Sequence, residues 1–122
     1  MTFQLTNDLA EMPLLAEHLE QFCSGHGIGP DVTSQFNLAL DEIVTQIIAN
    51  GYGNREIDRR IRINLAHDGA TLIARIEDDA AAFDPLARDA ASRGMNLVQT
   101  LVDEISYTRE RDQNVLVIRK AI

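Results

Sequence analysis

Apolar residues in the first half of the chain recur at the spacing of two amphipathic helices. They return every three or four positions between residues 9 and 23, and again between residues 36 and 48. Asp31 or Thr33 is expected to cap the second helix, which should stop at Gly51. A short strand at Thr2–Leu5 is expected to precede both helices.

A period of two takes over after residue 60 and predicts strands. Asp68-Gly69 is a hairpin signal between the first two, and the last two are expected to flank a turn at 111–114. The predicted elements of this half are strands at 61–65 and 72–76, a helix at 94–102, and strands at 105–109 and 115–119.

This order of elements predicts an α+β protein. Helices lying on one face of a mixed, mainly antiparallel sheet would bury both apolar surfaces, which makes a two-layer α/β sandwich. Because 122 residues suit one domain with its own core, we expect residues 1–122 to form a single domain.

Charge and composition restrict the classes of partner that this protein is expected to bind. The net charge of −8 and the pI near 4.7 disfavour nucleic acid and anionic membranes, so proteins and small ligands remain. The basic cluster at Arg55, Arg59, Arg60 and Arg62 is interpreted as a solvated strand edge. A single cysteine, no long apolar run and no secretion signal favour the cytoplasm.

A row of polar residues flanks the apolar stripe of the second predicted helix. Glu42, Gln46 and Asn50 are four positions apart and so lie on neighbouring turns of one helix flank. They are well placed to line a cleft between helix and sheet. Spacing alone favours the plainer interpretation, a solvated helix flank.

Two further features are candidates for ligand contact. Asp78 stands where a strand enters a loop, and its carboxylate can accept a hydrogen bond from a ligand amine or cap a turn. Gly94 precedes a predicted helix, whose N-terminus attracts anions, although a glycine there more often marks a turn.

Taken together and in order, these segments resemble the bacterial anti-sigma-factor serine kinases. That family belongs with gyrase, MutL, heat-shock chaperones and histidine kinases in the GHKL (Bergerat) ATPase group. Residues 38–52 resemble its N box, 78–85 and 93–97 its two glycine boxes, and 101–107 the segment that follows. The similarity covers nearly the whole chain, and four motifs in order are more specific than any one of them.

The resemblance implies a site for ATP or ADP with Mg²⁺. Glu42 stands at the family's general base, which activates the substrate hydroxyl, and Asp78 at the carboxylate that binds the adenine amino group. Gly94 and Met95 stand in the second glycine box, near the phosphates.

Several positions depart from the family pattern. Gln46 replaces the asparagine that holds magnesium, and its amide oxygen lies one methylene further out than Mg²⁺ geometry favours. Asn50 replaces a common histidine, while Ala80 and Ala82 replace glycines of the first box. Alanine there would cost about 1 kcal/mol or more if φ is positive, and would otherwise crowd the base. The segment 86–93 is short for an ATP lid.

Two functions stay open at this point. In the first, the protein is an anti-sigma regulatory factor that binds a sigma factor or an anti-sigma-factor antagonist and phosphorylates the antagonist on serine. In the second, it is a catalytically inactive binding module on the same scaffold, with a degenerate nucleotide pocket. The resemblance also leaves a homodimer open.

Overall fold

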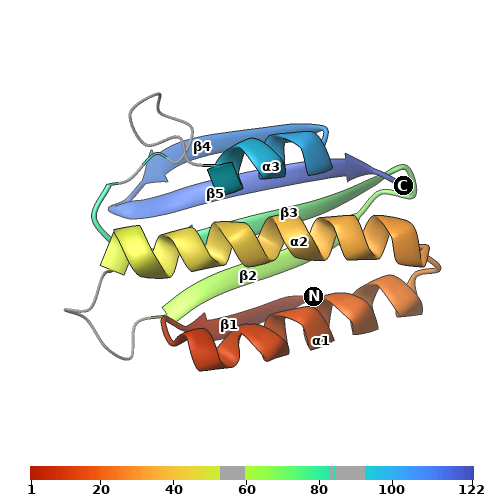
Figure 1. The fold of residues 1–122 in the computed structure, drawn as a ribbon, viewed down its shortest axis with the longest axis horizontal. Coiled ribbons are helices and arrows are strands. Elements are labelled where there is room, and N and C mark those ends of the chain that lie inside the picture. The colour runs from red at the N-terminus through yellow and green to blue at the C-terminus, as the bar shows by residue number, and fades with distance from the viewer. Residues whose placement is uncertain (53–59, 83, 85–92) are drawn as a thin grey trace.

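The computed structural model describes residues 1–52, 60–82, 84 and 93–122, with the backbone alone at positions 50–52 and 93. Five strands form one sheet, and the helices lie over it (Figure 1). The elements are β1 (Thr2–Thr6), the 3₁₀ turn η1 (Leu9–Glu11), α1 (Met12–Gly25), α2 (Pro30–Gln46), the π-helix η2 (Ile47–Tyr52), β2 (Arg60–His67), β3 (Thr71–Asp78), α3 (Arg93–Leu101), β4 (Glu104–Glu110) and β5 (Gln113–Ala121).

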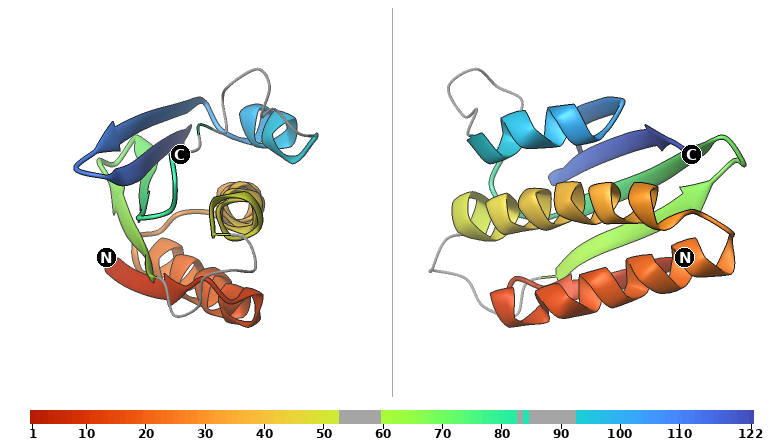
Figure 2. Two further views of the ribbon diagram at one scale, coloured as in Figure 1. Left: turned by 90° about the vertical axis from the view of Figure 1, so that its left-hand side faces the viewer. Right: turned by 45° about the vertical axis from the view of Figure 1, so that its right-hand side comes forward.

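The strands lie in the order β1-β2-β3-β5-β4, and every neighbouring pair is antiparallel. Seen along the sheet, α1, α2 and α3 all lie on one side of it (Figure 2). The predicted α+β, two-layer sandwich is therefore confirmed. The sheet is antiparallel throughout its described strands, where a mixed one was expected.

The core lies between this sheet and the helices. Alternate residues of the central strands are buried on the helix side, as Ile61 and Ile63 of β2 and Ala74 and Ile76 of β3 show. The intervening residues, such as exposed Arg62, face away from the helices. This alternation is that of a sheet packed on one face and solvated on the other.

The helices contribute one apolar side each to this core. The buried residues of α1 and α2 are Leu15, Leu19, Phe22, Cys23, Phe36, Ala39, Leu40, Ile43 and Val44. In the described part of the chain, no helix combines the length and apolarity needed to span a bilayer.

The ends of α2 differ from the sequence prediction. Gly29 is the N-cap and Pro30 the first residue, while neither Asp31 nor Thr33 caps; the Thr33 hydroxyl donates to the Gly29 carbonyl at 2.8 Å. Proline suits this position because its φ is helical and its missing N–H is not needed there. The helical backbone also continues through Gly51 to Tyr52, with its last six residues in π form.

The last hairpin is tighter than predicted. Arg111 and Asp112 have φ values of 51° and 63° and make a two-residue turn, because positive φ at both positions matches the twist of the flanking strands. Asn114, expected in the turn, is paired with Asp78 in the sheet instead. This shift has consequences for the candidate site.

Candidate functional site

The three candidate segments meet at one end of the molecule. The C-terminal half of α2, the end of β3 and the start of α3 all lie at the left in Figure 1. Asp78 is in phase with buried Ala74 and Ile76, so its side chain points to the side of the sheet that α2 covers. Segments distant in sequence are thus brought to one region by the fold.

Glu42 contacts two of the other candidate residues. Its Oε1 accepts a hydrogen bond of 3.2 Å from Nε2 of Gln46, one turn further along α2. It also lies directly against Gly94 on α3: a Cβ placed on Gly94 would be 1.6 Å from Oε1 of Glu42 and 2.2 Å from its Cδ. Only a glycine leaves room for this carboxylate.

The carboxylate of Glu42 therefore lies at the first turn of α3. A negative charge is stabilised there by the helix dipole, by about 0.3–1 kcal/mol for a partly exposed group. Glu42 is half-buried. The same position is where a helix start would receive a phosphate, so the protein's own carboxylate stands in that place.

The end of β3 holds a second carboxylate in a different setting. Asp78 is only 4% exposed. Its Oδ1 accepts hydrogen bonds from Nδ2 of Asn114 at 2.9 Å and from the Ala80 N–H at 3.0 Å. Burial raises the pKa of Asp78, and these two hydrogen bonds oppose that rise.

Asn114 is the centre of a polar cluster around the loop after β3. Its Nδ2 also contacts the carbonyl oxygens of Ala80 at 3.4 Å and Ala81 at 3.1 Å, and its Oδ1 accepts from the Tyr107 hydroxyl at 2.5 Å. Nη1 of Arg109 donates to the same Oδ1 at 3.1 Å and to the Ala80 carbonyl at 2.9 Å. We call Asp78, Tyr107, Arg109 and Asn114 the Asp78 clamp.

The sequence interpretation missed this clamp because Asn114 was assigned to a turn. The signal was present: Asn114 is in phase with Leu116 and Ile118, and a polar residue in phase with apolar ones predicts a buried hydrogen-bonded group. Asn114 is 4% exposed, as buried as Asp78.

The alanines of the segment that resembles a first glycine box are accommodated without backbone strain. Among the described residues, only Arg111 and Asp112 combine positive φ with a side chain, so Ala80 and Ala82 do not. Ala80 is 4% exposed and packs in the core, while Ala82 is exposed. The cost expected for a left-handed alanine therefore does not arise here.

The remaining candidate residues belong to α3, to η2 and to the expected ATP lid. Met95 is 2% exposed and its side chain belongs to the core. The Asn50 side chain and residues 86–92 of the segment 86–93, which was expected to be a short ATP lid, lie outside what the structure describes. Because a π-turn takes one residue more than an α-turn, the α-helical spacing that aligned position 50 with Glu42 does not extend past Gln46.

The geometry tests how well this region fits a magnesium nucleotide. At the β3 end, a buried carboxylate is held in place by the clamp, which suits recognition of a ligand amine. At the α3 end, the Glu42 carboxylate fills the space beside Gly94 and carries the same sign of charge as a phosphate. Gln46, the expected magnesium ligand, is hydrogen-bonded to that carboxylate. The phosphate end as arranged does not fit the group.

Comparison with solved structures supports the fold. The RsbU and RsbW domains of Rv1364c from Mycobacterium tuberculosis superpose with a TM-score of 0.74 at 13% identity, covering 98% of this chain and 31% of that one. The histidine kinase domain of the blue-light activated histidine kinase from Erythrobacter litoralis EL346 gives a TM-score of 0.63 at 13% identity, covering 92% and 59%. The chain thus spans about a third and under two thirds of these proteins.

No curated protein sequence matches this chain. A family profile does, however, and its description is a histidine kinase-like ATPase domain. The match runs from residue 5 to residue 120, which takes in the last two residues of β1, the helices α1, α2 and α3, and all of β5 except Ala121. The chain therefore belongs to the histidine kinase-like ATPase domain family.

Proposed function

We propose that this protein is an anti-sigma regulatory factor of the GHKL type, acting in the cytoplasm by binding a sigma factor or an anti-sigma-factor antagonist. Four motifs that resemble the anti-sigma-factor kinases support this, and three of them meet at one end of the fold. The structural similarity over 98% of the chain to a protein with a domain named RsbW agrees with it.

The contact between Glu42 and Gly94 favours the non-catalytic form of this function. A kinase of this type needs the phosphates close to the start of α3. The carboxylate beside Gly94 takes the space there and carries the same sign of charge as a phosphate. The regulator acts by binding, and its nucleotide pocket is degenerate.

Calorimetric titration with magnesium ADP and magnesium ATP tests this choice. We expect wild-type affinity weaker than the micromolar range, and no phosphoserine when candidate antagonists are incubated with magnesium ATP. Micromolar affinity together with a phosphorylated antagonist would establish the kinase instead. Gln46→Asn is a second check, since only a nearly intact pocket gains affinity from the shorter side chain.

The substitution Glu42→Gln further distinguishes the non-catalytic regulator from a kinase. If Glu42 blocks the phosphate position, the neutral amide should raise nucleotide affinity about tenfold, which corresponds to about 1.4 kcal/mol. If Glu42 is instead a general base in a working pocket, the substitution should abolish phosphate transfer and leave affinity almost unchanged. Asp41→Gln is the matched control, because Asp41 is exposed on the same helix.

A further inference from the structure

The charge of this protein is unevenly distributed along the chain. All eleven lysine and arginine residues lie at or after Arg55, whereas the first 54 residues carry seven acidic residues and no basic one. This N-terminal part, which includes α1 and α2, therefore contributes −7 of the net charge of −8. The two helices that cover β1 and β2 form a strongly acidic layer.

Four carboxylates on the outer side of this layer are not neutralised. Glu17 and Glu20 on α1 and Asp31 and Asp41 on α2 are exposed, and none of them has an ion-pair partner among the residues that the structure describes. Unpaired charges of one sign create a field that attracts a partner of opposite sign and raises its rate of association.

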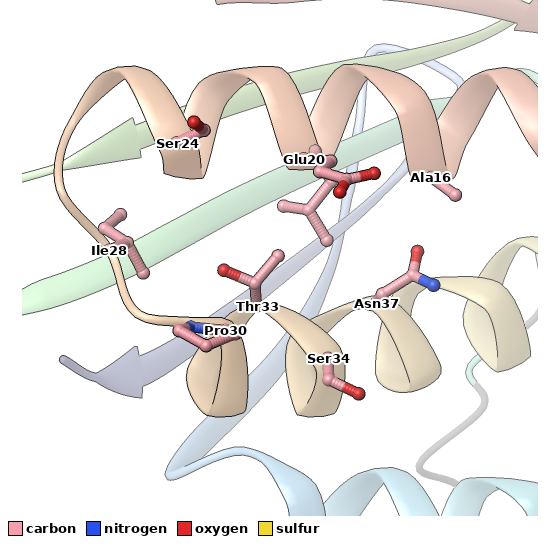
Figure 3. Close-up of a pocket in the computed structure, with 9 residues that line it drawn as sticks. Ala16, Glu20, Ser24, Ile28, Pro30, Thr33, Ser34 and Asn37 are labelled. Carbon is pink, nitrogen blue, oxygen red and sulfur yellow. The ribbon is translucent and has the colours of Figure 1, made fainter.

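A groove lies within the same surface, where α1 and α2 approach their connecting loop. Its volume is about 410 Å³, and Figure 3 shows Glu20 and Ser24 on one wall and Thr33, Ser34 and Asn37 on the other. The floor includes Leu19 and Ile28, which are 0% and 7% exposed. The complete lining is Ala16, Leu19, Glu20, Ser24, Ile28, Pro30, Thr33, Ser34 and Asn37.

The apolar floor of the groove and the carboxylate of Glu20 together fit a long cationic side chain. The aliphatic stem of an arginine or lysine would lie on the apolar floor, and its cation would reach the carboxylate of Glu20. The amide oxygen of Asn37, which points toward α1 in Figure 3, offers a further acceptor for a guanidinium. A negatively charged ligand would be repelled by the negative charges of the whole acidic layer.

We infer that the α1–α2 groove is a docking surface for a basic segment of a partner protein, with an arginine or lysine side chain seated against Glu20. This rests on the proposed function and narrows its partner. A sigma factor must carry a basic surface to bind DNA phosphates, whereas an antagonist has no such requirement. The groove therefore selects the sigma factor, through its basic surface.

The test measures binding of each purified sigma factor of the source organism to the full chain by biolayer interferometry. Wild type is compared with Glu20→Lys and with the control Glu104→Lys, an exposed carboxylate on β4 outside the helical layer. We expect Glu20→Lys to weaken binding about tenfold or more, and Glu104→Lys less than about twofold. Circular dichroism establishes that both variants are folded.

A peptide probe makes the groove testable without a sigma factor. It is a helical peptide with arginine at every fourth position, compared with a version carrying glutamine instead. Only the arginine peptide should shift the NMR amide signals of Ala16, Ser24, Ser34 and Asn37, and Glu20→Lys should remove the shifts.

The outcomes separate the two proposals. Equal sigma-factor binding by wild type and Glu20→Lys overturns the groove and leaves the proposed function standing. Peptide shifts in the groove without binding of any sigma factor overturn the sigma factor as the occupant of the groove and leave the proposed function to be met only by an antagonist. Self-association that Glu20→Lys abolishes, measured by sedimentation, assigns the groove to a second copy and overturns the inference.

Discussion

The two carboxylates at the candidate site are held in opposite ways. Asp78 is buried, and side chains from β4 and β5 surround it and the loop that follows it. Glu42 is half-buried and interacts with Gln46 of its own helix and with the glycine of a neighbouring one. At the β3 end, a hydrogen bond from the neighbouring strand β5 and one from the following loop therefore hold the Asp78 carboxylate in place. At the α3 end, a rotation of the Glu42 side chain can move its carboxylate away. The two ends of one candidate site are therefore ordered by different means, one by hydrogen bonds across strands and the other by the close approach of two helices.

Removing the centre of the Asp78 clamp should have the largest effect. In Asn114→Ala, the Asp78 carboxylate and the Ala81 carbonyl each lose a buried hydrogen-bond donor, so we expect the free energy of unfolding to fall by about 2–3 kcal/mol. Urea denaturation measures this. Asn64→Ala is the control, because the half-buried Asn64 side chain makes a solvent-exposed hydrogen bond to Thr2 of the edge strand, and its loss should cost less than about 0.5 kcal/mol. Similar losses in both variants would show that the clamp has no special role.

Filling the space at Gly94 should have an intermediate effect on the free energy of unfolding. The size of this effect should depend on whether residue 42 is a glutamate. Gly94→Ala forces the Glu42 carboxylate out of its place, and because that carboxylate is the flexible end of a side chain we expect a cost of only about 1 kcal/mol. In a Glu42→Ala background the same change should become neutral or stabilising, since alanine favours a helix.

A double-mutant cycle by urea denaturation checks this, with an expected coupling of about 1–2 kcal/mol. Gly25→Ala is the control, because a Cβ at that position meets no atom within 4 Å. A Gly94→Ala effect that is unchanged by Glu42→Ala would show that the two residues do not compete for one space.

The charge of Asp78 should give the smallest effect, visible in the pH dependence of stability. Burial raises the pKa of Asp78 above its unfolded value, so the folded state holds its proton more tightly. Stability from this group is therefore present below the unfolded pKa, near 3.9, and falls as pH rises through the folded pKa.

Asp78→Asn keeps the acceptor oxygen for Asn114 and Ala80 and removes the charge. The variant should gain stability relative to wild type as pH rises through this window, in denaturation measured at a series of pH values. A constant difference between the two proteins would contradict a raised pKa.

Part of this site was readable in the sequence. Motif order identified Glu42, Gln46, Asp78 and Gly94 as candidates, and in the fold Glu42 contacts both Gln46 and Gly94. Their roles in nucleotide binding stay predictions. Asn114 was missed because the boundary between strand and turn depends on φ at two residues, Arg111 and Asp112, whose types do not require positive values.

The local pattern of the sequence determined most of the architecture. Hydrophobic periods of 3.6 and 2 predict helices and strands because each element must bury one side, and they identified the three α-helices and five strands that the described residues form. The uneven charge is likewise a property of the sequence alone. Only the tertiary structure decided that Glu42 takes the space beside Gly94 and that Asn114 bonds Asp78, 36 residues away. Such contacts depend on which strands become neighbours and how closely two helices approach, and neither is encoded in the spacing of residues within one segment.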